Sequence, residues 1–207
     1  MENYRIELDT LQNALIGVEN MAPSSDFDLN LDQDRHMPSQ LRNAAVLIPI
    51  KSGPCGLEVI LTRRSIALRN HPGQISFPGG KQDATDISFT HTALREAEEE
   101  IGLAQRDVKI IGVLPKHETV TAFLVHPFVG LVPNDFTPEL LTDEVAEVFS
   151  APLNHLLDPA NYRVEGRMWQ GFERHYFAVP YGPYYIWGAT ARMLRMLADI
   201  WEKSDAR

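Results

Sequence analysis

The most conspicuous group of ionisable side chains in the sequence is a run of glutamates, Glu96, Glu98, Glu99 and Glu100, directly after Arg95. On an α-helix, which turns by about 100° per residue, Glu96, Glu99 and Glu100 share an arc of about 100° while Glu98 points away. Divalent cations such as Mg²⁺ and Mn²⁺ prefer oxygen ligands of this kind. The spacing therefore predicts a metal site on one face of a helix.

A Glu-rich helix face can also be no more than a solvated surface. Here the three carboxylates adjoin an apolar face formed by Ala93, Ala97 and Ile101, which would anchor the helix. Like charges three or four residues apart destabilise a helix by about 0.2–0.5 kcal/mol per pair, and poor solvation increases that repulsion. We therefore expect a bound cation and, without it, at least one carboxylate with a raised pKa.

The glutamates must be positioned by a helix over residues 90–101, which Gly102 would end. Hydrophobic periodicity predicts further helices at 7–18, 152–157 and 187–203, and strands at 44–50, 57–62, 108–114, 123–132, 145–149, 162–169 and 175–179. The turn-forming segment 51–56 predicts a hairpin between the first two strands. Many strands and few helices, in irregular order, indicate an α/β (α+β) sandwich with a mixed β-sheet.

The length of 207 residues predicts one domain with an N-terminal extension. Residues 1–36 are strongly acidic and suggest a short amphipathic helix followed by a loose linker. Residues 37–207 form the predicted domain, whose compact part would begin near Arg42. Because the extension holds none of the candidate site residues, we expect its removal to leave activity largely intact.

Composition and charge exclude several classes of protein. Apolar residues make up 44% and charged residues 23% of the chain, as in ordinary globular proteins. A net charge of −9 without a basic stripe argues against a nucleic acid partner. The longest apolar run, 44–50, is far shorter than the roughly 18 residues of a membrane span. With a lone cysteine, Cys55, which cannot form an internal disulfide, we expect a cytoplasmic protein; the sequence leaves a homodimer open.

Residues 95–103, with the sequence REAEEEIGL, resemble the core of the Nudix box, R-E-U-x-E-E-x-G-U, in which U is apolar. Gly80 fits the first glycine of the full box. Asp86 stands where the box has its first glutamate, and eight residues instead of seven separate it from Arg95. Both departures concern the loop before the helix and leave the helix itself intact.

A second segment resembles the signature of the coenzyme A pyrophosphatase branch of Nudix hydrolases, L-L-T-x-R-S-x3-R-x3-G-x3-F-P-G-G. This chain has Ile60 in place of the first leucine and otherwise follows the pattern through Leu61-Thr62-Arg63-Arg64-Ser65, Arg69, Gly73 and Phe77-Pro78-Gly79-Gly80. The resemblance implies a Nudix-type α/β/α sandwich. It also implies metal-dependent hydrolysis of the coenzyme A diphosphate to 3′,5′-ADP and 4′-phosphopantetheine.

For the reaction, the resemblance implies that Glu96, Glu99 and Glu100 hold Mg²⁺ or Mn²⁺. Catalysis would depend on Glu96, Glu99 and Arg95, with Arg95 holding the carboxylates in place through charge-assisted hydrogen bonds. The general base stays open between the helix glutamates, which we favour, and two glutamates of the segment 144–147.

For the substrate, the resemblance implies that Gly79 and Gly80 let the backbone approach a phosphate. Arg63, Arg64 and Arg69 form the nearest cationic group, and forked guanidinium groups suit phosphate oxygens. Ion pairs with neighbouring acids are the alternative role for these arginines.

Two alternatives to coenzyme A hydrolysis remain from the sequence. One is a Nudix hydrolase for another nucleoside diphosphate derivative, such as NADH or ADP-ribose. This alternative does not explain why the 61–80 signature is present. The other is a Nudix-fold module that binds but does not react, although all three helix carboxylates are present.

Overall fold

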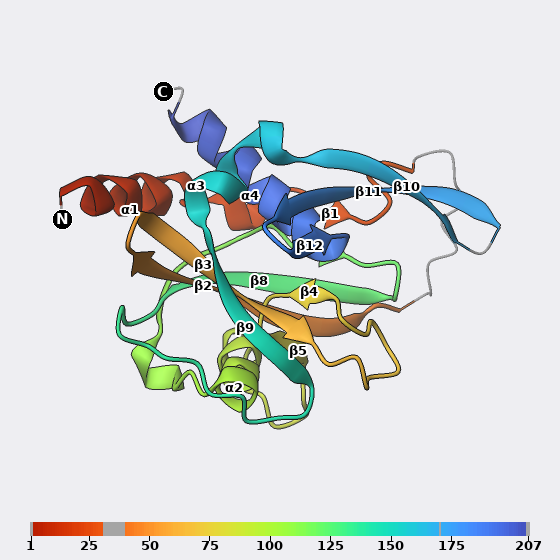
Figure 1. The fold of residues 1–207 in the computed structure, drawn as a ribbon, viewed down its shortest axis with the longest axis horizontal. Helices are drawn as coiled ribbons and strands as arrows, with labels where there is room; N and C mark the ends of the chain where they lie inside the picture. The colour runs from red at the N-terminus through yellow and green to blue at the C-terminus, as the bar shows by residue number, and fades with distance from the viewer. Residues whose placement is uncertain (1, 31–39, 170, 206–207) are drawn as a thin grey trace.

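A nine-stranded mixed sheet forms the centre of the computed structural model, which describes residues 2–30, 40–169 and 171–205 (Figure 1). In the middle of the sheet, β2 (Arg42–Gly53) runs parallel to β8 (Phe123–Leu131) and antiparallel to β3 (Gly56–Arg64). The remaining strands of this sheet are β1 (Ser24–Ser25), β4 (Ile75–Ser76), β5 (Gly79–Lys81), β6 (Lys109–Val113), β7 (His117–Glu118) and β9 (Val145–Pro152).

One face of the sheet is covered by α2 (Phe89–Ile101), which carries the glutamates (Figure 1). Its apolar side, including Ala93 and Ala97, is fully buried with Ala45 and Leu47 of β2. The helix begins at the N-cap Ser88, whose side chain accepts a hydrogen bond from the His91 backbone N–H. It ends at Gly102, where φ is 71°, a conformation that glycine adopts without strain. This fixed helix turns its polar side toward β5.

The opposite face packs against α1 (Glu2–Ala14), α3 (Leu153–Leu157), α4 (Ala189–Asp205) and a second, three-stranded sheet (Figure 1). That sheet consists of β10 (Arg163–Trp169), β11 (Phe172–Tyr181) and β12 (Tyr184–Trp187), paired antiparallel. Single turns of 3₁₀-helix, η1 (Val18–Asn20), η2 (Gln105–Asp107) and η3 (Pro159–Asn161), complete the described elements. The layers form the α/β/α sandwich with a mixed sheet that the sequence predicts.

All seven predicted strands and the predicted helices are present, with their ends shifted by a few residues. The hairpin is confirmed, since Gly53 and Gly56 face each other across its turn. The last helix begins at Ala189 instead of 187, because β12 extends to Trp187 and Gly188 takes a φ of 66°.

The prediction of a detached extension with a loose linker is wrong for the described part of residues 1–36. Leu11 and Leu15 of this region are buried in the main core, and α1 packs against α4. Further on, β1 pairs with β7, and Asp28 lies 2.7 Å from the Arg192 guanidinium. These partners are far away in sequence, so composition alone concealed them. Residues 31–36 of the predicted linker lie outside the described residues.

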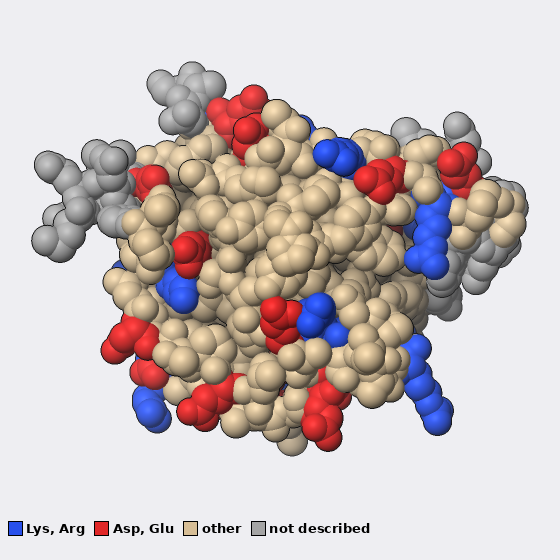
Figure 2. Space-filling view, in the orientation of Figure 1, with Lys and Arg blue, Asp and Glu red and all other residues tan. Residues whose placement is uncertain are grey.

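Acidic and basic side chains are interspersed on the face of the molecule shown in Figure 2, without a continuous stripe of Lys and Arg. Within the described ranges, none of the helices has both the length and the apolar character to span a membrane.

Candidate active site

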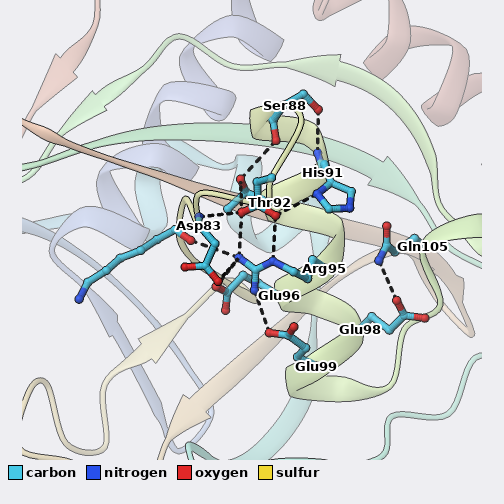
Figure 3. Close-up of polar contacts among 11 residues, drawn as sticks. Asp83, Ser88, His91, Thr92, Arg95, Glu96, Glu98, Glu99 and Gln105 are labelled. Atoms are coloured by element: carbon cyan, nitrogen blue, oxygen red, sulfur yellow. Dashed lines mark hydrogen bonds and ion pairs between the residues drawn. The ribbon is translucent and has the colours of Figure 1, made fainter.

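The acidic face of α2 separates its glutamates as the helical spacing predicts (Figure 3). Glu96 and Glu99 both contact Arg95, whereas Glu98 points toward Gln105, whose Nε2 donates to its carboxylate at 2.8 Å. Glu100 is buried, with only 6% of its surface exposed. The three predicted metal ligands thus lie on one side of α2, and Glu98 lies apart from them.

Arg95 connects the helix to the loop before it (Figure 3). Its Nη1 donates to Glu99 at 2.8 Å and its Nη2 to Glu96 at 3.1 Å. The same guanidinium donates to the Lys81 carbonyl at 3.2 Å and makes two hydrogen bonds to Asp86. These carboxylates raise the pKa of Arg95, with the Asp86 bonds as the largest cause, so the side chain stays charged. Arg95 is placed to orient Glu96 and Glu99.

Asp86, which the sequence left without a clear part, lies with its carboxylate fully buried beneath Arg95. Besides the guanidinium, the Thr92 hydroxyl donates to it at 2.9 Å and the Asp83 backbone N–H at 2.8 Å. The Arg95 hydrogen bonds hold the pKa of Asp86 far below its usual range, so this carboxylate remains ionised. Asp86 is therefore a positioning residue for Arg95.

Gly79 and Gly80 bring the backbone of β5 against the glutamates. The Gly79 N–H donates to Glu100 at 3.2 Å, and its φ of 153° together with the close Val46 backbone leaves no room for a Cβ. A Cβ at Gly80 would overlap the carboxylate of Glu96. The sequence-predicted phosphate turn thus lies directly beside two of the predicted metal ligands.

The electrostatics of the glutamates suit a hard divalent cation. Burial raises the pKa of Glu100 to about 8, and burial is also the main cause of the raised pKa of Glu96. Both carboxylates are therefore disfavoured as anions until a positive charge compensates them. Among the residues that the structure describes, no three carboxylate, imidazole or thiol side chains lie close enough together to hold a metal ion. Arg95 instead donates to Glu96 and Glu99, while Glu100 accepts from the Gly79 N–H.

The three candidate arginines differ in their surroundings. Arg63 lies 2.8 Å from Glu147, and Arg64 lies 3.7 Å from Glu144. Arg69 is exposed and, within the described ranges, has no ion-pair partner. Its side chain lines a cavity of about 790 Å³ on the face of the sheet opposite α2. Of the three, Arg69 has the guanidinium that is free to meet a substrate.

This cavity lies between the central sheet and the three-stranded sheet. Phe77 and Val46 form part of its wall, and Val46 pairs in register with Gly79 of the phosphate turn. The opposite wall contains side chains that the sequence analysis did not select, among them Arg167, Arg174, Tyr176 and Trp187. Arg167 and Arg174 lie on the same face of the strand pair β10–β11. The sequence could not indicate them, because tertiary packing decides which face of a strand lines a cavity.

A family model and proteins of known sequence match this chain over most of its length. A family described as "NUDIX domain" matches residues 41–170. Proteins named "Uncharacterized Nudix hydrolase NudL", from Salmonella dublin and Salmonella enteritidis, are 42% identical over 175 residues, or 84% of this chain and 90% of theirs. Among solved structures, a MutT protein from Methanosarcina mazei covers 82% of this chain and 96% of its own, with 19% identity and a TM-score of 0.47.

Proposed function

This chain belongs to the Nudix hydrolases, which act on phosphoric anhydride bonds, and we propose that its substrate is coenzyme A, cleaved at the diphosphate to 3′,5′-ADP and 4′-phosphopantetheine. The observation that carries the proposal is the placement of the 61–80 signature. Its Arg69 and Phe77 line the cavity, while its Gly79 lies against Glu100. A single segment therefore connects a substrate-sized cavity to the carboxylates.

Glu96, Glu99 and Glu100 are the residues that would hold Mg²⁺ or Mn²⁺. The cation supplies neutralisation of the diphosphate oxygens and a lowered pKa for an attacking water. Arg95 keeps Glu96 and Glu99 on the face toward β5 through its charge-assisted hydrogen bonds. The absence of a side chain at Gly80 makes room for the Glu96 carboxylate, which would overlap a Cβ at this position.

A glutamate of α2 is our candidate for the general base that takes the proton from the attacking water. Glu99 is half exposed and Glu96 is partly exposed, so both can reach solvent. The competing Glu147 accepts from the Tyr184 hydroxyl at 2.7 Å and pairs with Arg63. Both Glu147 oxygens are thus engaged by other side chains, as Glu96 and Glu99 are by Arg95. Our preference for the helix therefore rests on the position of Glu96 beside Gly80.

Product identification tests this proposal. Purified protein would be incubated with coenzyme A, dephospho-coenzyme A, NADH and ADP-ribose, each with Mg²⁺, with Mn²⁺ and with a chelator. We expect mass spectrometry to find 3′,5′-ADP and 4′-phosphopantetheine from coenzyme A in both metal samples and in no chelator sample. Cleavage of coenzyme A at any other bond, or no metal-dependent cleavage of it, would contradict the proposal.

A further inference from the structure

Two arginines occupy directly opposite positions on β10 and β11, whose hairpin forms one wall of the cavity. Arg167 of β10 and Arg174 of β11 are partners in the antiparallel register, and both side chains line the cavity. Like charges at directly opposite positions of a strand pair destabilise it. Such a pair is unfavourable in the free protein unless an anion lies between the two guanidinium groups.

The surroundings neutralise these two charges only in part. Arg167 is exposed and makes no ion pair within the described residues. Arg174 packs over the Phe27 ring, and its Nη2 donates to the Asp26 carbonyl at 3.4 Å. The buried Nε of Arg174 has no hydrogen-bond acceptor among the described residues. A buried donor without a partner is unfavourable, and an incoming oxygen anion would satisfy it.

Asp26 is the one acidic residue among the described residues that line this cavity, and its single charge, which attracts Arg174, cannot compensate both arginines. Its carboxylate contacts His117 Nε2 at 3.2 Å and accepts from the Val120 backbone N–H at 2.9 Å. The wall at β10 and β11 therefore keeps a positive charge that faces the cavity.

Aromatic rings lie beside the arginine pair. Tyr176 follows Arg174 on the same face of β11, and its ring centroid is 5.0 Å from that of Trp187. Both rings line the cavity. Aromatic faces suit a nucleobase, and paired guanidinium groups suit a phosphate dianion. This end of the cavity thus combines the features that recognise a phosphorylated nucleoside.

We propose that Arg167 and Arg174 together bind a phosphate monoester on the nucleoside half of the substrate. The inference rests on the proposed function and sharpens it: the enzyme prefers nucleoside diphosphate derivatives that carry an additional ribose phosphate. Arg63 and Arg64, which the sequence suggested for binding this phosphate, are paired with glutamates. The main phosphate-binding residues are therefore those of the three-stranded sheet.

The test compares substrates that differ only in this phosphate, coenzyme A and dephospho-coenzyme A. A lost charge-assisted contact corresponds to about a 10- to 150-fold change. We expect Arg167→Ala to lower kcat/KM for coenzyme A by that factor and to leave dephospho-coenzyme A little changed. Arg163→Ala is the matched control, because Arg163 is an exposed arginine on the same face of β10 that does not line the cavity. An unchanged preference in Arg167→Ala would overturn the proposal.

Two further measurements separate this role from folding and from catalysis. Arg167→Glu places an acid opposite Arg174, so we expect its Tm not to fall while its preference for coenzyme A disappears. Calorimetric binding of 3′,5′-ADP and of 5′-AMP, without metal, needs no turnover. If Arg167→Ala binds 3′,5′-ADP more weakly than the wild type does but binds 5′-AMP equally well, the phosphate site is supported. This result would hold even if the wild type did not cleave coenzyme A. Equal weakening of both nucleotides, or of neither, contradicts it.

Discussion

Arg95 and Asp86 form a two-point contact, in which Nε donates at 2.9 Å and Nη2 at 3.0 Å to the two carboxylate oxygens. The aspartate lies in the loop before α2, and the arginine lies on the helix that bears the predicted metal ligands. This geometry connects a fully buried carboxylate to the orientation of Glu96 and Glu99. The residue that departs from the Nudix box in type and spacing is therefore part of the site's support.

Removing the charge of Asp86 tests that support. Asp86→Asn breaks a buried pair, which costs about 3–5 kcal/mol in the free energy of unfolding. Asp83→Asn is the control, since Asp83 is largely exposed and lies 3.8 Å from Arg95; an exposed pair contributes about 0–1 kcal/mol. Urea denaturation of both variants gives the comparison. Equal losses in the two variants would mean that Asp86 does not hold Arg95.

The glutamates of α2 are expected to divide into two classes. Glu99→Gln and Glu100→Gln should each lower kcat by about 100-fold or more and weaken metal binding, because even outer-sphere changes at metal sites cost about 10–100-fold. Glu98→Gln should change neither, since Glu98 is directed to Gln105. Steady-state kinetics with a metal titration checks this. Comparable losses in all three variants would show that the assignment of helix faces is wrong.

Burial of Glu100 predicts a pH dependence of stability in the metal-free protein. Its pKa is raised from 4.5 to about 8, so the folded state keeps a proton that the unfolded state has lost in this range. The free energy of unfolding should therefore fall as pH rises from about 5 to 8. Glu100→Gln should flatten this fall, and Mg²⁺ should remove it. Denaturation curves measured with a chelator at both ends of this pH range check the prediction. The same fall in the free energy of unfolding in Glu100→Gln as in the wild type would contradict it.

The N-terminal helix is expected to stabilise the domain, although the sequence predicts that removal of residues 1–36 leaves activity largely intact. Leu11 is fully buried, so Leu11→Ala should cost about 2–5 kcal/mol in the free energy of unfolding. Ile16 is 76% exposed, and Ile16→Ala should stay within about 0.5 kcal/mol of the wild type. Thermal or urea unfolding of the two variants checks this. Indistinguishable curves would restore the view of α1 as an appendage.

The sequence predicted what depends on local order. The carboxylate face of α2 followed from helical periodicity, and the longer strands followed from runs of β-branched and aromatic residues. Strands of two to four residues, such as β4 and β12, are too short to show alternation and were not predicted. Short elements of this kind form because their neighbours in space pair with them.

Contacts between distant segments could not be predicted from one sequence. Asp28 belongs to an acidic stretch, and only the fold reveals its ion pair with Arg192. Likewise, the pairing of Arg167 with Arg174 depends on the register of a hairpin and on the side that faces the cavity. The cavity wall formed by β10 and β11 was therefore missed, whereas the carboxylate face of α2 was found.

Competition between substrates in one vessel tests the central claim most directly. Equimolar coenzyme A, NADH and ADP-ribose would be mixed with enzyme and Mg²⁺, and their relative rates of consumption give the ratio of their kcat/KM values. The account predicts that coenzyme A disappears first, by about tenfold or more, because only coenzyme A carries the additional phosphate. Consumption of NADH or ADP-ribose at a rate equal to or above that of coenzyme A would contradict the assignment and leave only a Nudix hydrolase of different specificity.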